Sequence, residues 1–299
     1  MPCPPSPGGI VSTAGVTPVE TEQGLNMDEH APRAAPTVVE TGAASDLDLI
    51  TSPHVQAVVY VPARLPEWMS ELAEAVTAGE FEVPRAILDD VGPDEVESAV
   101  WHAVAAGRGR DDLRRALVDD VVSLVERVRA ATGAASFTIR IFTGEPSTRC
   151  GYHVDTVPPR SATIGLLRVY NGAGTPYLDP GALTGMRDFY KYLSRRERLV
   201  RDLSEARDRT RAEAIGAELD RLDAELPFVS GRTPRVAPSG SVVMFEHLDA
   251  SHHWSDAGSE QPWIHCSPME GGPRLVVNVS PRPGRPQRPR ARATRVTSR

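Results

Sequence analysis

Lysine is almost absent from this chain, which has one lysine, Lys191, against 32 arginines among its 299 residues. This bias is typical of a GC-rich bacterial genome and says nothing about function. Three cysteines are too few for a disulfide framework over this length. No run of 18 apolar residues is present, and the segment after Met1 lacks the cationic and apolar parts of a secretory signal. We therefore expect a cytoplasmic protein without a membrane span.

The charge of the chain is acidic and unevenly distributed. The formal net charge is −7, but residues 281–299 hold seven arginines and no acidic residue, so residues 1–280 carry −14. A body this acidic argues against general nucleic-acid binding. The chain also has no Walker loop, no GxGxxG and no GxSxG nucleophile elbow. The common nucleotide and serine-hydrolase sites are therefore not predicted.

Both ends of the chain are predicted to be disordered. Residues 1–45 are rich in Pro, Gly, Ala, Thr and Glu, and residues 281–299 are rich in Arg and Pro. Neither stretch has enough apolar surface to offset its chain entropy. The residues between them suffice for one domain. The sequence predicts a mainly helical part over 46–133, followed by a β-barrel catalytic core over 134–280.

The period of the apolar residues changes along this domain. Spacings of three or four residues predict helices over 66–78, 93–106 and 111–132, the last ending at Gly133. A short apolar run predicts a buried strand over 55–61. After Gly133, alternation predicts antiparallel strands over 136–143 and 163–170, and 241–245, 263–266 and 274–280 are further strand candidates. Residues 187–226 return to helical spacing on a polar background, which predicts one long helix or a helical pair.

These elements predict an α+β fold. We expect a double-stranded β-helix, that is, a jelly-roll or cupin-like barrel, with N-terminal helices and a helical insertion. The insertion at 187–226 is either a structural excursion packed on the barrel, a lid over the site or the contact of a homodimer. The sequence does not decide between these alternatives.

The pattern His-x-Asp occurs twice, as His153/Asp155 and as His247/Asp249. On a strand, residues i and i+2 face the same side, so each pair can reach one metal ion. A double-stranded β-helix carries this pair on an early strand and a second histidine on the penultimate strand. His265 follows His153 by 112 residues but follows His247 by only 18. We therefore predict His153, Asp155 and His265 as metal ligands and catalytic centre, a set that suits Fe(II) with three open positions.

Arg274 is the predicted anchor for a cosubstrate. Strand alternation places Arg274, Val276, Asn278 and Ser280 on one face and Leu275, Val277 and Val279 on the other. If the first face lines the barrel interior, the Arg274 guanidinium points inward. A buried guanidinium needs a partner, which is either the carboxylate of 2-oxoglutarate or a protein carboxylate. Tyr170 and Thr175 are further candidates for hydrogen bonds to the cosubstrate.

A zinc site is the alternative for the same segments. Cys150 has CxxH spacing with His153, and Cys266 follows His265. Adjacent strand residues face opposite sides, so Cys266 should not bind the same metal ion as His265. Cys150 likewise faces away from His153, unless Gly151 breaks the strand. The segment 246–254 is predicted as a loop at the barrel mouth. Its His252 or His253 either binds substrate, acts as an acid or base, or is solvated.

Three segments together resemble a known bacterial family. They are Cys150-Gly-Tyr-His-Val-Asp155, Tyr170-Asn-Gly-Ala-Gly-Thr175, and His265-Cys-Ser-Pro268 with Arg274-Leu-Val-Val277. In this order they resemble domain of unknown function 1826, over residues 55–280. Some members of that family lie near zinc-uptake genes, so the resemblance keeps metal homeostasis open. The motif order also resembles the iron/2-oxoglutarate oxygenases, which implies iron ligation by His153, Asp155 and His265 and cosubstrate binding by Arg274.

The leading hypothesis is therefore an Fe(II)- and 2-oxoglutarate-dependent oxygenase. Its partners would be a small-molecule substrate and molecular oxygen, with no nucleic acid and no membrane. The second hypothesis is a non-enzymatic zinc-binding protein of metal homeostasis. A third is an iron oxygenase that uses no 2-oxo acid and leaves Arg274 paired with a protein carboxylate.

Overall fold

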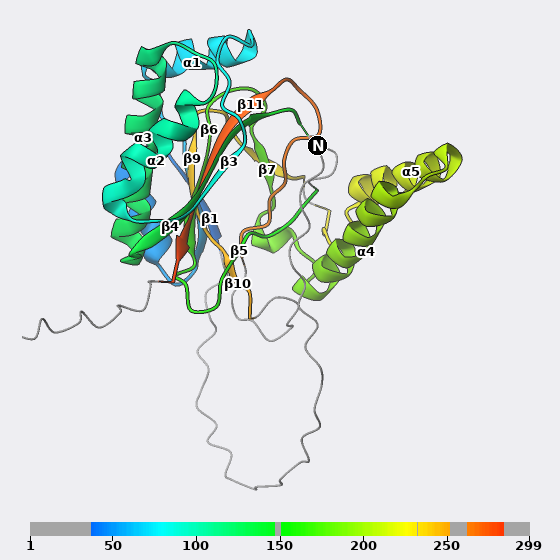
Figure 1. The fold of residues 1–299 in the computed structure, drawn as a ribbon. Coiled ribbons are helices and arrows are strands. Elements are labelled where there is room, and N and C mark those ends of the chain that lie inside the picture. The colour runs from blue at the N-terminus through cyan, green and yellow to red at the C-terminus, as the bar shows by residue number, and fades with distance from the viewer. Residues whose placement is uncertain (1–36, 147–150, 232, 252–261, 284–299) are drawn as a thin grey trace, which may run out of the picture. The chain divides into compact units, whose positions relative to one another are not determined.

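A seven-stranded sheet forms the centre of the fold (Figure 1). The computed structural model describes residues 37–146, 151–231, 233–251 and 262–283, which belong to one compact unit. The strand order is β1-β2-β9-β6-β11-β4-β3, and every neighbouring pair is antiparallel except β1 with β2. The strands are β1 Thr37–Thr41, β2 Val55–Tyr60, β3 Ala86–Val91, β4 Ser136–Gly144, β6 Ile164–Val169, β9 Val242–Glu246 and β11 Arg274–Arg282.

Shorter pairings accompany this sheet. β5 (Thr156–Val157) runs parallel to β10 (Leu248–Asp249), and β7 (Thr175–Tyr177) runs antiparallel to β8 (Arg235–Ala237). Between them, His265 forms isolated bridges to both His153 and Tyr177. Positions 153, 265, 177 and 235 thus form one row of neighbouring backbone segments. Within the described residues, no sheet closes into a barrel.

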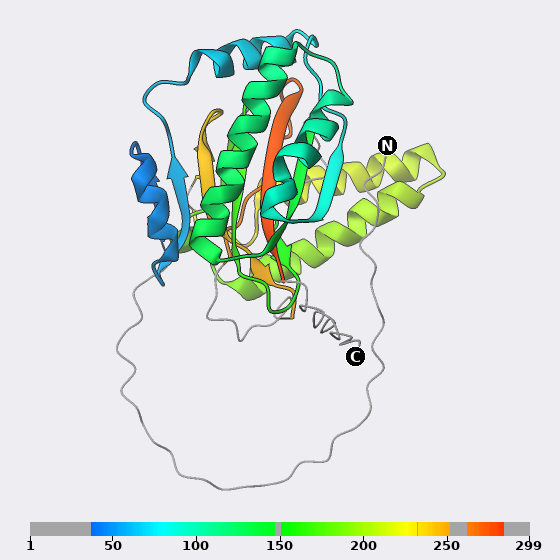
Figure 2. The same ribbon diagram turned by 60° about the vertical axis from the view of Figure 1, so that its left-hand side comes forward.

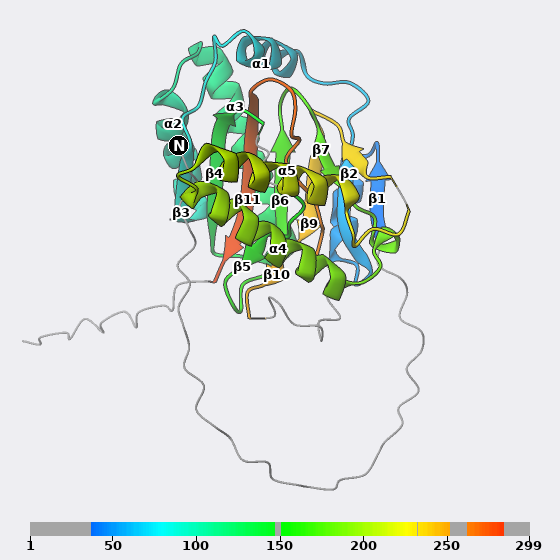
Figure 3. The same cartoon turned by 90° about the vertical axis from the view of Figure 1, so that its right-hand side faces the viewer.

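Helices cover one face of the large sheet, and a helical hairpin packs on the short segments beyond its other face. α1 (Glu67–Thr77), α2 (Val96–Ala105) and α3 (Asp111–Thr132) lie on one face (Figure 2). α4 (Met186–Glu205) and α5 (Arg209–Glu225) form a hairpin across the other side (Figure 3). Three short 3-10 helices, η1 Ala44–Thr51, η2 Pro93–Glu95 and η3 Pro180–Ala182, complete the described elements. No described helix is long and apolar enough to cross a membrane.

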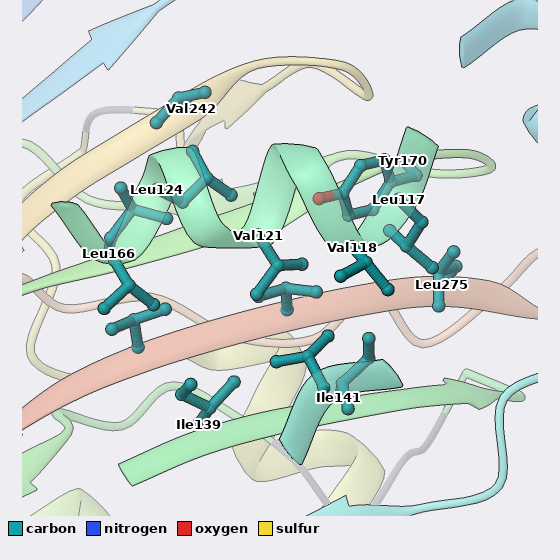
Figure 4. Packing of buried hydrophobic residues seen from close by; sticks show 14 of the residues in the cluster. Leu117, Val118, Val121, Leu124, Ile139, Ile141, Leu166, Tyr170, Val242 and Leu275 are labelled. Carbon is teal, nitrogen blue, oxygen red and sulfur yellow. The ribbon is translucent and has the colours of Figure 1, made fainter. Parts of the chain in front are cut away.

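The main core lies between α3 and the large sheet (Figure 4). Val118 and Val121 of α3 are fully buried because their spacing places them on one helix face. They pack with Ile139, Ile141 and Leu275, which alternate along β4 and β11. β11 has the two faces that the sequence predicts: Leu275, Val277 and Val279 join this core, whereas Val276 joins a second cluster on the opposite face.

The predicted helices, the insertion as a helical pair and most strands agree with the structure. The prediction of disorder is wrong for 37–45, because β1 is ordered by parallel pairing with the buried β2. It is also wrong for residues 281–282, which extend β11. The part 46–133 is not only helical, since it supplies β2 and the unpredicted β3 to the sheet. Segment 263–266 forms isolated bridges rather than a strand.

Candidate metal centre

His153 and Asp155 come from the segment that leads into β5. Their backbone is held on both sides, because His153 bridges His265 and the Asp155 carbonyl accepts from Leu248 N at 2.9 Å. The intervening Val154 is buried in a different cluster, with α4 and α5. The two side chains therefore share a face, as the spacing i, i+2 predicts for an extended segment.

His265 is brought to this pair by the backbone. His153 N donates to His265 O at 2.8 Å, and His265 N donates to His153 O at 3.1 Å. Residues that exchange both hydrogen bonds in an antiparallel pair lie directly opposite each other, with their side chains on the same face. The two imidazole ring centroids are accordingly 4.5 Å apart. The predicted convergence of histidines 112 residues apart is present in the structure.

The three side chains form a cluster whose potential ligand atoms all lie within 4.8 Å of one another. His153 Nε2 lies 3.8 Å from Asp155 Oδ1, and His265 Nε2 lies 3.9 Å from Asp155 Oδ2. These separations are too long for hydrogen bonds. Ligand atoms that sit about 2.0–2.2 Å from a shared metal ion lie roughly 3–4 Å apart, so the spacing fits a metal ion between them.

Both imidazoles are oriented by main-chain carbonyls. His153 Nδ1 lies 2.8 Å from Gly151 O, and His265 Nδ1 lies 3.3 Å from Trp263 O, each two residues upstream. A carbonyl accepts only, so Nδ1 carries the proton in each ring. The lone pair of Nε2 then points into the cluster. This arrangement fixes the tautomer and ring direction that a metal ligand needs.

The electrostatics of the cluster also favour ligation. Burial, followed by the adjacent His153, lowers the pKa of His265 to about 3, so its imidazole is neutral near pH 7. For Asp155, burial alone would raise the pKa. The opposing influence of His265, His153, His247 and Arg140 outweighs burial, so the pKa of Asp155 lies below its usual value and the side chain is a carboxylate.

Asp155 has a further partner that the sequence did not reveal as such. Asn278 Nδ2 donates to Asp155 Oδ2 at 3.0 Å. Asn278 Oδ1 accepts from Ser280 Oγ at 3.1 Å, and Ser280 Oγ lies 3.0 Å from His247 Nε2. Alternation along β11 placed Asn278 and Ser280 on this face, but nothing in the sequence indicated which side chain they contact. The other His-x-Asp histidine, His247, thus lies behind the carboxylate rather than in the ligand set.

Aromatic rings surround His265. Trp263 stacks on it with centroids 4.3 Å apart and 16° between planes, and Phe245 lies 5.5 Å away. Trp263 is 1% exposed, and its Nε1 has no hydrogen-bond partner among the described residues. This wall keeps the imidazole out of water, which is the physical cause of its low pKa.

The helical insertion lies behind the ligand segments. Tyr152, Ile264 and Cys266 alternate with the ligands and pack in one buried cluster with Phe189 of α4 and Leu219 of α5. The hairpin thus packs on the face of these segments that is opposite the ligand side chains, and its role as a lid stays a prediction. A homodimer contact through its exposed side stays a prediction.

The other predicted site residues do not all lie on the same side of the sheet as the metal cluster. Arg274 is buried and donates from Nη1 to Ala173 O at 3.1 Å. Thr175 is buried on β7, two residues from Tyr177. Tyr170 is not brought to the cluster, because it packs in the core on the α3 side and its hydroxyl donates to Asp120 at 2.6 Å. Asp249 accepts from Ser251 instead of joining His247 at a metal. Cys150, His252 and His253 lie outside the described residues.

The fold and site together define an α+β protein with a candidate centre of two histidines and one carboxylate. The chain belongs to the family described as Protein of unknown function (DUF1826), whose model matches residues 42–207. This match includes His153 and Asp155 and ends before His265.

The solved structures that are similar to the chain include two plant dioxygenases. One is a dioxygenase for auxin oxidation from rice, with 13% identity, a TM-score of 0.41 and 82% of each chain covered. The other is dioxygenase for auxin oxidation 1 from Arabidopsis thaliana with 2-oxoglutarate, with 11% identity, a TM-score of 0.38, and 84% of this chain and 93% of that chain covered. No curated protein matches the chain.

Proposed function

We propose that this protein is an Fe(II)-dependent oxygenase that uses 2-oxoglutarate and oxidises a C–H bond of a small metabolite. One observation carries the proposal: the ligand atoms of His153, Asp155 and His265 lie within 4.8 Å of one another. Two imidazoles and one carboxylate on one side of a metal ion are the ligand set of non-haem iron oxygenases. Iron bound by this set would supply the activation of molecular oxygen.

The ligand set supports an open rather than a closed site. Among the described residues, the cluster has three members and no fourth His, Cys, Asp or Glu. Cys266 alternates with His265 and packs in the cluster with α4 and α5, so its thiol faces away from the imidazoles. A closed zinc site of four protein ligands would need a side chain from outside the described residues. Three protein ligands leave positions for a cosubstrate and oxygen.

Arg274 supports 2-oxoglutarate as the cosubstrate. It lies on the same face of β11 as Asn278, four residues away, and Asn278 contacts Asp155. Four residues of strand span about 13 Å, a gap that a five-carbon dicarboxylate and an extended arginine side chain can bridge together. The guanidinium would bind the distal carboxylate in bidentate fashion. Thr175 stays a candidate for a further hydrogen bond to the cosubstrate.

The strand arrangement supports a double-stranded β-helix around this site. Four antiparallel neighbours, β4-β11-β6-β9, form one layer, and the row 153, 265, 177, 235 forms the other. His265 lies on the segment before the final strand, the position expected for the second histidine. Side chains between the two layers would line the interior, with Trp263 and Phe245 excluding water.

An anaerobic titration tests the proposal. The full-length protein is loaded with Fe(II), 2-oxoglutarate is added, and the weak visible charge-transfer band of the chelate is recorded. We expect the band in the wild type and in Asp249→Asn, and its loss in Asp155→Asn. Absence of the band in the wild type, together with tight zinc binding that needs the cysteines, would overturn the oxygenase in favour of a zinc-binding protein.

A further inference from the structure

A chain of buried polar side chains runs from Asp155 along the face of the large sheet that is opposite α3. Asn278, Ser280 and His247 are 7%, 6% and 1% exposed. The links are Asn278 Nδ2 to Asp155 Oδ2 at 3.0 Å, Ser280 Oγ to Asn278 Oδ1 at 3.1 Å, and Ser280 Oγ to His247 Nε2 at 3.0 Å. His247 Nδ1 ends the chain at Thr163 O, 2.9 Å away.

The chemistry of the carboxylate fixes the direction of the first link. An ionised carboxylate only accepts, so the amide nitrogen of Asn278, not its oxygen, faces Asp155. Asn278 Oδ1 then faces Ser280, whose hydroxyl donates to it. His247 Nε2 lies 3.0 Å from Ser280 Oγ, but His247 Nδ1 donates to Thr163 O, so Nε2 of the neutral ring is an acceptor and does not share the Ser280 proton that goes to Asn278. Rotation of the Asn278 amide would therefore break two hydrogen bonds at once.

The neighbouring strand is shaped to hold this chain. Gly165 of β6 has no side chain where His247 lies, and a Cβ there would be 1.8 Å from His247 Cε1. Val276 and Phe245, on the same face, are apolar and buried. Buried polar side chains are costly to desolvate, so an apolar residue at 278 or 280 would satisfy packing more simply. A role at Asp155 explains why polar residues occupy these positions.

Each oxygen of Asp155 faces one of the two imidazoles, and the two distances are nearly equal. Oδ1 lies 3.8 Å from His153 Nε2, and Oδ2 lies 3.9 Å from His265 Nε2. Distance alone therefore does not select one oxygen as the metal ligand, and a carboxylate can bind a metal ion through one oxygen or both. The hydrogen bond from Asn278 to Oδ2 breaks this symmetry.

We propose that Asn278 is a positioning residue that keeps Asp155 a one-oxygen ligand. It holds Oδ2 so that Oδ1 binds the metal ion, and Ser280, by donating to Asn278 Oδ1, holds the Asn278 amide in the required orientation. A second Asp155 oxygen would occupy a coordination position, so Asn278 preserves that position for the cosubstrate. This inference rests on the metal centre of the proposed function, and it concerns residues outside the ligand set.

The test uses full-length protein loaded anaerobically with Co(II), whose visible absorption reports the number and arrangement of ligands. The variants are Asn278→Leu and Ser280→Ala. The matched control is Thr138→Val, because Thr138 is the register partner of Ser280 on β4 and is equally buried, but bonds Asp89 instead. Circular dichroism and thermal unfolding establish that each variant folds. Binding of 2-oxoglutarate to the cobalt protein is measured in parallel.

We expect Asn278→Leu to bind Co(II) with an altered visible spectrum and to bind 2-oxoglutarate about 10- to 100-fold more weakly, the range for lost hydrogen bonds to a metal ligand. Ser280→Ala should change both in the same direction by less, and Thr138→Val should match the wild type. If folded Asn278→Leu keeps the wild-type spectrum and 2-oxoglutarate affinity, the inference is overturned. If Asn278→Leu does not fold, an unchanged Ser280→Ala overturns it.

The wild type separates this inference from the proposed function. A wild type that binds Co(II) but not 2-oxoglutarate contradicts the proposed cosubstrate, while the cobalt spectra of the variants still decide the role of Asn278. A wild type that binds no Co(II) contradicts the metal centre, and the inference is overturned with it.

Discussion

His153 and His265 exchange both of their backbone hydrogen bonds, with N–O distances of 2.8 and 3.1 Å, although 112 residues separate them. The imidazoles lie side by side because the backbones are paired, not because a local motif holds them. The site is therefore as rigid as this pairing, which the cluster with α4 and α5 supports from behind.

The first prediction separates the two His-x-Asp pairs. Asp155→Asn should lower the affinity for Fe(II) or Co(II) by at least about 100-fold, because it removes the anionic ligand of the cluster. Asp249→Asn should bind metal like the wild type, since its carboxylate accepts from Ser251. An anaerobic metal titration, monitored by isothermal calorimetry, measures the affinity of both variants. Loss of binding in Asp249→Asn alone would show that the wrong pair was assigned.

The second prediction concerns Gly151, whose carbonyl orients His153. A Cβ at this position would lie 2.0 Å from Arg196 Nε, and Arg196 is locked in a buried ion pair with Asp223 at 2.8 Å. Gly151→Ala should therefore lower the free energy of unfolding by about 1–3 kcal/mol through overpacking and weaken metal binding.

The matched control for this variant is Gly216→Ala, because Gly216 lies inside α5 with nothing within 4 Å of its Cβ position. It should raise the free energy of unfolding by about 0.5–1 kcal/mol, as alanine favours a helix interior. Urea unfolding and Co(II) titration provide both readouts. A Gly151→Ala protein as stable as the wild type and with its metal affinity would contradict the role of this contact.

The third prediction is an acid destabilisation of the metal-free protein. The ordinary pKa of a histidine side chain is 6.5, and burial lowers the pKa of His265 to about 3 in the folded protein. Between these values the unfolded chain binds a proton that the folded chain does not, so the free energy of unfolding falls as the pH falls from 6.5 towards 3. The slope from this one group is at most about 1.4 kcal/mol per pH unit. Asp155, whose pKa is lowered, contributes a further loss below its ordinary value of 3.8.

Urea unfolding of the metal-free protein at pH 7, 5.5 and 4.5 measures this slope. His265→Leu should show a shallower decline than the wild type, because it removes the group whose pKa the fold lowers. Equal slopes in the wild type and His265→Leu would mean that His265 titrates in the fold as it does in the unfolded chain.

The fourth prediction tests the cosubstrate anchor. Arg274→Met should weaken 2-oxoglutarate binding about 10- to 100-fold, the loss expected for charge-assisted bonds of about 1.5–3 kcal/mol, and should leave Co(II) affinity unchanged. Arg274→Lys should weaken it less, because it keeps the charge but not the planar fork. Titration of the cobalt protein with 2-oxoglutarate measures the effect. Unchanged affinity in Arg274→Met would support an oxygenase that uses no 2-oxo acid.

Much of the site could be predicted from the sequence because it depends on periodicity. The i, i+2 spacing places His153 and Asp155 together, and strand alternation separates Leu275 from Arg274. α3 ends at Gly133, which has the φ of 65° typical of a C-cap. Each of these features is local, so a short window of sequence contains it.

The rest depends on contacts between distant segments. Asn278 meets Asp155, and His247 meets Ser280, only because β9, β6 and β11 are neighbours in the sheet. Tyr170 was expected at the cosubstrate, but its side chain lies on the α3 side, where Asp120 accepts from its hydroxyl. The strand β3 was missed because its acidic pair at 89–90 has low strand propensity, and Asp90 has a φ of 57°.

The most direct test of the metal centre is a crystal structure of the Fe(II)-loaded protein, grown without oxygen, with anomalous diffraction at the iron edge. We expect one peak per chain, bound by Nε2 of His153 and of His265 and by a single oxygen of Asp155, with the remaining positions free of protein ligands. A peak elsewhere, or a fourth protein ligand such as a cysteine sulfur, would contradict this account.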